Sequence, residues 1–483
     1  MPNRPLQPST AKYAWNLIGR EMPHKRPAGD RVHDYDEVYE SYDEEAVRAQ
    51  ASRCIQCPDP LCAQGCPLAN RIPEWLAQAA AGNFLEAAEL SRSTSNMPEI
   101  CSRICPQERL CEGSCILRSK GEAVAIGAVE RFINDYAFRH GAVGFSAAPP
   151  NGRSAAIIGS GPAGLACADE LARLGYRVTV FESLFIPGGL LVNGIPSFKL
   201  EKHIVERRID LLARNGVDFR LGVQVGRDLP LAQLRHDYDA VFLGHGAQKA
   251  KTAGVPGENL AGVLAALPFL IEKNLGSPLL GLPTVDVTGK RVAVLGGGDT
   301  AMDCLRTAIR AGAQSATCIY RRDLANMPGS RKEYANAVEE GAVFRFLTNP
   351  AEIVAGAQGG VAGVRCLQMG LGAPDASGRR KPVPVPGTEF EVPADLAIVA
   401  YGFDPVAFPE DSEFSAVKTN DWGGIVVDGN QMTSLPGVFA GGDSVRGPSL
   451  AVHAVRDARR AAQGIHRYLN SRRPDAAPSA TQE

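Results

Sequence analysis

Hydrophobic residues follow two different periods along the chain, and the change lies near residue 150. Before it, apolar side chains recur at helical spacing, as in the segment that Pro73 opens and that runs through Phe84 and Ala88. After it, short apolar runs that suit buried strands alternate with helical segments, beginning with a strand at 154–158. The pattern predicts a mainly helical N-terminal domain followed by α/β structure.

Two units with the order strand, glycine turn, helix, strand occur at 155–182 and 291–321, with a less regular segment between them. Small residues and prolines at 147–152 mark a boundary just before the first unit. We therefore predict the α/β fold class, with two Rossmann-like dinucleotide-binding domains behind the helical domain.

The first glycine turn has the pattern of a dinucleotide site, with Gly159, Gly161 and Gly164 directly after a strand and at the start of a helix. The three glycines allow a tight turn, close approach of the backbone to a pyrophosphate, and close packing of helix on strand. Glu182 ends the next strand, where a carboxylate can accept the hydroxyls of an unmodified ribose. A lone turn of this kind is often only structural, but strand, helix and acid in register favour nucleotide binding.

The second turn carries the opposite charge at the corresponding position. It contains Gly296, Gly298 and Ala301, and the next strand ends in Arg321 and Arg322. A guanidinium can bind a ribose 2′-phosphate bidentately, which favours NADP over NAD, although a solvated basic turn is the alternative. The two turns together predict FAD at the first and NADPH at the second. Asp299 and Thr300 lie in the same turn and join the predicted NADPH site.

Eight of the twelve cysteines lie between residues 54 and 115, with the spacing C-x2-C-x4-C-x3-C and then C-x3-C-x5-C-x3-C. The N-terminus lacks the apolar core of a secretory signal, so we expect a cytoplasmic protein in which clustered thiols bind metal rather than form disulfides. A run of four whose last member precedes proline favours iron-sulfur clusters over zinc, and an unligated structural role is the third possibility. The cysteines concerned are Cys54, Cys57, Cys62, Cys66, Cys101, Cys105, Cys111 and Cys115.

Net charge, hydropathy, electron counting and cysteine spacing narrow the possible classes of function. The net charge of -2 gives no basic field for nucleic acid, and no apolar run approaches the roughly 18 residues of a membrane helix. NADPH delivers two electrons as a hydride while clusters carry one, so a flavin is needed between them. The flavoprotein half has no C-x-x-C, which disfavours a disulfide reductase. A zinc-stapled nucleotide-binding scaffold is the non-enzymatic alternative.

Several segments closely resemble the family of small subunits of NADPH-dependent glutamate synthase: RICPQERLCEGSC, AIGAVERFIND, GGLLVNGIPSFKLEKHIVERRIDLL, LGGGDTAMDCLRTAIRAGA and YRRDLANMPGSRKEYANAVEEG. The resemblance covers nearly the whole chain, and the N-terminal part is also similar to dihydropyrimidine dehydrogenase. It implies an NADPH domain inserted within the FAD domain. The segment GVFAGGDSVRGPSLAVHAVRDARRAA resembles the flavin-binding element of the wider pyridine-nucleotide flavoprotein superfamily. The residues thereby assigned to the flavin are Gly189, Gly442, Asp443 and Ser449.

The shared cysteine pattern implies two 4Fe-4S clusters. The first would take Cys54, Cys57, Cys62 and Cys115, and the second would take Cys66, Cys105, Cys111 and Glu130. Glu130 stands where the related dehydrogenase places a glutamine, and an oxygen ligand would alter the potential of the cluster. In the alternative, Glu130 is an ordinary helix-surface acid and Cys101 is the fourth ligand.

The predicted domains are 1–148 for the clusters, 149–287 and 405–470 for the two parts of the FAD domain, 288–404 for NADPH, and 471–483 as a mobile tail. The resemblance implies that electrons pass from NADPH through FAD and the clusters to a large glutamate synthase subunit with glutaminase and FMN-containing synthase activities. Gly441, His453 and Ala458 depart from the family pattern near the predicted flavin. The alternative is therefore an NADPH:ferredoxin-type oxidoreductase with a different partner.

Overall fold

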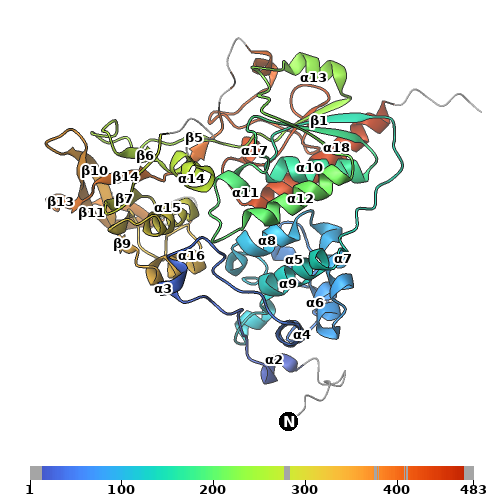
Figure 1. The fold of residues 1–483 in the computed structure, drawn as a ribbon, viewed down its shortest axis with the longest axis horizontal. Helices are drawn as coiled ribbons and strands as arrows, with labels where there is room; N and C mark the ends of the chain where they lie inside the picture. The colour runs from blue at the N-terminus through green and yellow to red at the C-terminus, as the bar shows by residue number, and fades with distance from the viewer. Residues whose placement is uncertain are drawn as a thin grey trace, which may run out of the picture.

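The computed structural model describes residues 13–276, 283–374, 378, 380–406, 408 and 412–472. Three lobes meet at its centre: a helical N-terminal domain at the bottom of Figure 1, one α/β domain at the upper right and a second at the left. This arrangement confirms the predicted fold class. The predicted tail lies outside the described residues except for Ser471 and Arg472. Over the described ranges, no helix has the length and apolar character needed to cross a membrane.

The helical domain is organised around Trp75, Val129 and Ile133, none of which has exposed surface. Asp43 begins one of its helices by accepting a hydrogen bond from the backbone N–H of Ala46, which satisfies a donor of the first turn. The described helices of this domain are α2 (Ala14–Leu17), α3 (Ala28–Arg31), α4 (Glu44–Ser52), α5 (Leu61–Gly65), α6 (Ile72–Ala81), α7 (Phe84–Thr94), α8 (Pro98–Ile104) and α9 (Ile126–Arg139), with short 3-10 turns η1 (Gln107–Arg109) and η2 (Ile116–Ser119).

The helical segment predicted to run on from Pro73 is two helices, so its continuity was wrong. Gly82 ends α6 with φ of 88°, a left-handed conformation that favours glycine, and α7 starts two residues later. Trp75 and Phe84 are nevertheless buried in the same core. The apolar spacing runs across the break because both helices face that core.

The first α/β domain contains a parallel sheet in the order β16-β4-β1-β2-β3. Ile157 of the central strand pairs with Val180 on one side and Phe242 on the other. The strands are β1 (Ser154–Ile158), β2 (Arg177–Glu182), β3 (Asp218–Leu221), β4 (Ala240–Leu243) and β16 (Val438–Ala440). The helices are α10 (Pro162–Arg173), α11 (Leu190–Asn193), α12 (Lys202–Arg214), α13 (Leu231–Asp237), α17 (Asp443–Arg446) and α18 (Ala451–Ser471), with the 3-10 turn η4 (Glu413–Ala416).

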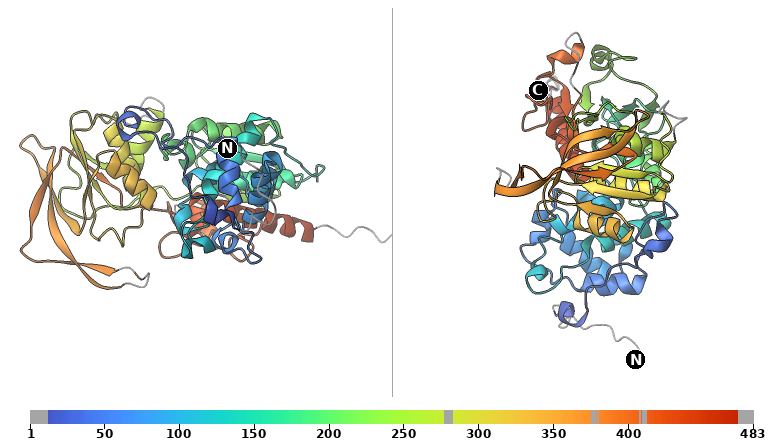
Figure 2. Two further views of the ribbon diagram at one scale, coloured as in Figure 1. Left: turned by 90° about the horizontal axis from the view of Figure 1, so that it is seen from below. Right: turned by 90° about the vertical axis from the view of Figure 1, so that its left-hand side faces the viewer.

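The second α/β domain has its own parallel sheet in the order β6-β14-β7-β8-β9, and an antiparallel sheet, β10 to β13, lies at the outer edge of the molecule (Figure 2). The parallel strands are β6 (Val263–Ala265), β7 (Arg291–Leu295), β8 (Ser315–Ile319), β9 (Val343–Arg345) and β14 (Leu396–Val399), with helices α14 (Ala266–Leu275), α15 (Asp299–Arg310) and α16 (Arg331–Glu339). The antiparallel strands are β10 (Thr348–Ala355), β11 (Val361–Pro374), β12 (Arg380–Pro384) and β13 (Phe390–Pro393).

The chain passes between the two α/β domains through a pair of antiparallel strands, β5 (Lys249–Ala250) and β15 (Phe403–Asp404). The strand β16 then joins the first sheet beside β4. The second domain is thus inserted in the first. By strand pairing, β6 belongs to the second sheet, although the sequence analysis assigned residues up to 287 to the first domain. We propose that the boundary between the first part of the FAD domain and the NADPH domain lies at β5. The other domain boundaries stay predictions.

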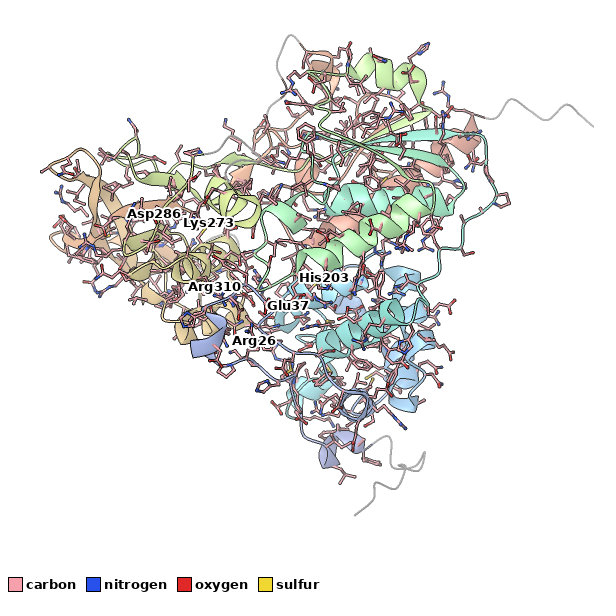
Figure 3. The ribbon with its side chains drawn as sticks, in the orientation of Figure 1. Arg26, Glu37, His203, Lys273, Asp286 and Arg310 are labelled. Carbon is pink, nitrogen blue, oxygen red and sulfur yellow. The ribbon has the colours of Figure 1, made fainter. Side chains whose placement is uncertain are left out.

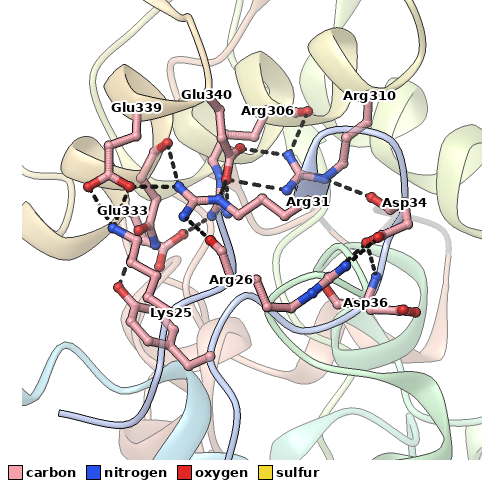
Figure 4. A network of polar contacts seen from close by, with 12 residues as sticks. Lys25, Arg26, Arg31, Asp34, Asp36, Arg306, Arg310, Glu333, Glu339 and Glu340 are labelled. Atoms are coloured by element: carbon pink, nitrogen blue, oxygen red, sulfur yellow. Dashed lines mark hydrogen bonds and ion pairs between the residues drawn. The ribbon is translucent and has the colours of Figure 1, made fainter. Parts of the chain in front are cut away.

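Residues 24–40, which we call the N-terminal strap, cross from the helical domain to α15 and α16 and return (Figure 1). On the far side, Lys25 and Arg31 bind the carboxylates of Glu339 and Glu340 at 2.5 and 2.7 Å (Figure 4). On the near side, Glu37 accepts from Arg103 at 2.7 Å. Figure 3 places Arg26 and Glu37 of the strap close to the centre, where the lobes meet. The strap therefore ties the second α/β domain to the helical one.

Candidate cofactor sites

The first glycine turn joins β1 to α10 and is enclosed on two sides. A methyl group on Gly159, whose φ is 94°, would lie 2.7 Å from the carbonyl oxygen of Gly244, and one on Gly164 would lie 1.9 Å from that of Gly159. A methyl group on Gly161 would meet no atom within 4 Å. The outer glycines are therefore required by packing, while the middle one faces open space. A pyrophosphate that approaches the backbone needs this arrangement, so the site fits a dinucleotide.

Glu182 lies directly against this turn at the end of β2, with 7% of its surface exposed. One carboxylate oxygen accepts hydrogen bonds from the backbone N–H of Ser160 at 3.0 Å and from its hydroxyl at 2.6 Å. The other accepts from the backbone N–H of Leu184 at 3.0 Å. These contacts hold the carboxylate beside the start of α10, where the sequence places a ribose.

Two segments distant in sequence close over the same turn. A methyl group on Gly189 would lie 2.7 Å from the Cα of Gly161, and one on Gly442 would lie 2.9 Å from the Cβ of Ala163. Both glycines have positive φ, 53° and 75°. The two segments that the family resemblance assigns to the flavin thus converge on the first glycine turn.

Asp443 and Ser449 follow Gly442 and bind each other. An Asp443 carboxylate oxygen accepts from the backbone N–H of Ser449 at 3.1 Å, and the Ser449 hydroxyl lies 2.8 Å from Nδ1 of His453. Burial raises the pKa of Asp443 to about 7. The group is therefore poised to accept or donate a hydrogen bond near neutral pH.

The second glycine turn repeats this geometry between β7 and α15. A methyl group on Gly296, whose φ is 137°, would lie 2.4 Å from the carbonyl oxygen of Ala400, whereas one on Gly298 would meet nothing within 4 Å. Asp299 begins α15 and accepts from the backbone N–H of Ser330 at 2.8 Å. Thr300 and Ala301 complete the first turn of α15, and Ala301 is fully buried.

The two arginines predicted to bind a 2′-phosphate differ in their surroundings. Strand β8 ends at Ile319, so both lie in the turn beyond it. Arg321 is exposed, whereas Arg322 is 7% exposed and its Nε donates to the carbonyl oxygen of Arg380 at 2.9 Å. Arg321 is therefore the one whose guanidinium is accessible to a ligand.

The first predicted set of thiols lines one small cavity. Cys54, Cys57, Cys62 and Cys115 surround it together with apolar side chains such as Leu76. Burial raises the pKa of Cys54 to about 11 and that of Cys62 to about 12. Over the described ranges, no three Cys, His, Asp or Glu side chains converge closely enough to hold a single metal ion. Four thiols around a cavity suit a cluster with several iron atoms better than one zinc ion.

The second set lies where the helical domain meets the first α/β domain. Burial and the charges of Cys66 and Glu130 raise the pKa of Cys111 well above its ordinary value. A hydrogen bond with Cys101, together with burial, does the same for the pKa of Cys105. The five groups named for this set are thus neighbours. This proximity leaves Cys101 and Glu130 as rival fourth ligands.

Glu130 is held on the inner side of α9. One carboxylate oxygen accepts from Nδ2 of Asn70 at 2.9 Å and from the hydroxyl of Ser91 at 3.0 Å. Burial raises the pKa of Glu130 to about 7. These contacts make it a positioned interior group rather than the helix-surface acid of the alternative interpretation.

We expect Glu130→Ala to remove an iron ligand and to make the second cluster labile or shift its potential, while the first cluster persists. Glu130→Gln should have a milder effect, because its carbonyl oxygen can still reach iron. Iron content and paramagnetic resonance of the reduced protein measure both clusters. Cys101→Ala is the matched control. Full clusters in Glu130→Ala together with loss in Cys101→Ala would transfer the role to Cys101.

The sequence analysis did not single out His245. It lies two residues after the end of β4, and its Cα lies 3.1 Å from the position of a methyl group on Gly159. Burial lowers the pKa of His245 to about 4, so the imidazole is neutral at physiological pH. The sequence marks His245 only by the two glycines that flank it, Gly244 and Gly246.

Comparison with known proteins agrees with this geometry. Residues 31–142 match the family model of dihydropyrimidine dehydrogenase domain II, 4Fe-4S cluster, and residues 153–458 match that of pyridine nucleotide-disulphide oxidoreductase. The chain is 47% identical to the glutamate synthase [NADPH] small chain of Escherichia coli, over 95% of this chain and 98% of that one. It is 46% identical to the putative oxidoreductase AegA of Escherichia coli, over 93% of this chain and 70% of AegA.

Solved structures share the flavoprotein fold. Mycobacterium tuberculosis FprA in complex with NADPH matches with a TM-score of 0.55 and 23% identity, over 67% of this chain and 85% of that one. The chain thus combines two glycine turns, an inserted second domain and two thiol sets, and relatives match it over almost its full length. The chain belongs to the pyridine nucleotide-disulphide oxidoreductases and, within them, to the family of glutamate synthase [NADPH] small chains.

Proposed function

We propose that this protein is the NADPH-oxidising subunit of a glutamate synthase, with FAD at the first glycine turn, NADPH at the second and two 4Fe-4S clusters on the thiol sets. The observation that carries the proposal is the contact between the thiols and the first α/β domain. Met97, Ile100 and Cys101 belong to the hydrophobic core of that domain, and Cys105 packs against it. The second thiol set is therefore continuous with the flavin domain.

The residues of the chain position the cofactors and need not act as acids or bases. Glu182 binds a ribose, the start of α10 faces a pyrophosphate, and Arg321 neutralises a 2′-phosphate. When bound, the flavin accepts two electrons as a hydride and releases them singly, which lets iron-sulfur clusters carry them onward. The packing of α8 against α12 and α18 fixes the thiols relative to the flavin domain.

The route continues from the second thiol set to the first. Cys57 and Cys111 are both half-buried, and Cys57 lies beside Leu61 and Ile116, which expose 42% and 40% of their surface. Exposed apolar side chains next to an electron-transfer centre suit contact with another protein. We propose that electrons leave the chain there.

The proposed partner is the large glutamate synthase subunit, which makes glutamate from glutamine and 2-oxoglutarate. Relatives that are small chains of glutamate synthase support it, because a small chain implies a large one. We propose the cytoplasm as the site of action, because cluster ligation requires thiols kept reduced. The similarity to AegA and to a second putative oxidoreductase, UacF, at 43% identity supports a different partner as the second candidate.

Capture of the tagged full-length chain from its native cells tests this proposal. The large subunit should copurify, and the complex should form glutamate from glutamine and 2-oxoglutarate with NADPH. Copurification of another redox protein, with no such activity, would favour the second candidate.

We expect Cys57→Ala to retain FAD and its bleaching by NADPH, because the first glycine turn belongs to another domain. Electron delivery to the partner should fall, since one cluster loses a ligand. Flavin absorbance before and after NADPH, measured beside glutamate formation, separates the two effects. A folded variant without flavin would contradict the proposed division between domains.

A further inference from the structure

A cavity of about 560 Å³ lies where the strap, the helical domain and the second α/β domain meet. Its walls include Tyr39 of the strap, Gly127 at the start of α9, Phe198 before α12 and Lys332 of α16. None of its lining residues belongs to a glycine turn or to the thiol sets. The volume falls in the range of about 300 to 1,000 Å³ that is typical of small-molecule sites.

The walls of this cavity carry more positive than negative charge. Eight basic and five acidic side chains line it. Several of the acids are already neutralised within the wall, since Glu112 binds Arg20 at 2.5 Å and Glu333 binds Arg306 at 2.5 Å. Acids outside the wall, Asp135, Asp303 and Glu340, in turn bind Arg103, Lys199 and Arg306. The surplus of positive charge is therefore limited to the wall cations without an ion pair among the described residues, which are Arg118, Arg331 and Lys332.

Lys332 is the clearest member of that surplus. Its Nζ lies 4.1 Å from the centre of the Tyr39 ring, and among the described residues no carboxylate oxygen lies within 4.0 Å of it. Burial lowers its pKa, although the charge of Glu333 opposes that shift. Lys332 thus packs on an aromatic ring and forms no ion pair in the part of the chain that the structure describes, although the charges of Glu333, Glu112 and Glu108 are near enough to oppose the lowering of its pKa.

Asn336 adds a second unsatisfied donor to the same wall. It is 1% exposed, and its Oδ1 accepts from the hydroxyl of Tyr39 at 3.2 Å. Its Nδ2 has no hydrogen-bond partner within the described part of the chain, which is costly for a buried amide. The first turn of α16 also lines the cavity, so the positive end of this nine-residue helix faces it.

We propose that this cavity binds a small multivalent oxyanion, either a phosphate-bearing metabolite or a dicarboxylate. Lys332 is the central contact, Arg118 lies at the exposed rim, and α16 contributes backbone N–H groups. The ligand supplies the ion pair that Lys332 lacks. Because the walls come from the strap, the helical domain and both α/β domains, a bound anion connects them and stabilises their arrangement.

Isothermal titration of the full-length holoprotein tests the proposal, with pyrophosphate and succinate as separate probes at constant ionic strength and saturating NADP⁺. At least one probe should bind with a one-to-one ratio, and the one that binds identifies the class. Lys332→Met should weaken that binding at least about tenfold. Arg118→Gln, altered at the solvent-exposed rim, carries the test if Lys332→Met does not fold.

The control is Lys418→Met, an exposed lysine outside the cavity, which should bind the probe like the unaltered protein. Absence of binding by both probes would overturn the proposal, as would equal affinity in Lys332→Met. Loss of binding in Arg321→Ala would also overturn it, because the anion would then occupy the NADPH site.

Discussion

Replacing Arg321 by alanine should weaken NADPH binding about 10- to 100-fold and leave NADH nearly unaffected. A charge-assisted hydrogen bond to a phosphate contributes about 1.5 to 3 kcal/mol of binding free energy. NADH has no 2′-phosphate, so it makes no such bond with Arg321. The exposed position of Arg321 makes it the accessible partner. Titration of each nucleotide, followed through flavin reduction, measures the two affinities separately.

Substitutions of Arg322 and Arg365 serve as comparisons for this prediction. Arg322→Ala removes the bond to the Arg380 carbonyl, so it should lower stability, whereas the loss of NADPH affinity should be larger in Arg321→Ala. Arg365→Ala is the matched control, because it removes an exposed arginine of β11 that pairs with Glu352. An equal loss of NADPH and NADH in Arg321→Ala would refute the assignment.

Replacing Glu340 by glutamine should destabilise the contact between the strap and the second α/β domain by about 3 to 5 kcal/mol. The Glu340 side chain has no exposed surface and accepts from Arg31 at 2.7 Å, Arg306 at 2.8 Å and Arg310 at 2.6 Å (Figure 4). Removing this carboxylate charge leaves three guanidinium groups with one fewer anion among them. Hydrogen exchange over residues 24–40, together with thermal unfolding, measures the loss.

Glu339→Gln is the matched control, one residue earlier on α16. Glu339 binds Lys25 and Arg31 but exposes 45% of its side chain, so its loss should cost at most about 1 kcal/mol. Similar exchange rates in both variants would show that burial does not decide the strength of the contact between the strap and the second α/β domain.

The same carboxylate predicts an acid sensitivity. Hydrogen bonds from Arg306 and Arg310 outweigh burial and hold the pKa of Glu340 at about 2, below its usual 4.5. Because the pKa is depressed in the folded state, the stabilisation is present above pH 4.5 and is lost as pH falls toward 2. In Glu340→Gln this dependence of strap exchange on pH should be weaker, and the part that remains reports Glu339, whose pKa the hydrogen bonds from Lys25 and Arg31 also lower, against the effect of burial.

The sequence could predict features that depend on neighbours along the chain. The glycine turns are local, since Gly159 and Gly164 contact each other across five residues, and a strand and a helix flank them. The grouping of the first thiols followed from family resemblance, and the cavity lined by Cys54 and Cys115 agrees with it. Their assignment as cluster ligands stays a prediction.

Other features depend on contacts that no local pattern encodes. Arg31 and Glu340 are 309 residues apart, and nothing near either residue in sequence indicates the pair. The burial of Arg322 depends on Arg380 of the antiparallel sheet, and the placement of β6 depends on β14. The end of α6 at Gly82 could be read locally, but the apolar spacing that continues through it concealed the break.

The position of β16 at residues 438–440 bears on how the protein is made. This strand and the residues after it close the first glycine turn, yet β1 and β4 leave the ribosome some two hundred or more residues earlier. During synthesis the first sheet therefore stays incomplete, with one edge of β4 unpaired, while the inserted domain emerges and folds. Flavin binding at the first turn therefore requires β16, which is synthesised only after the inserted domain.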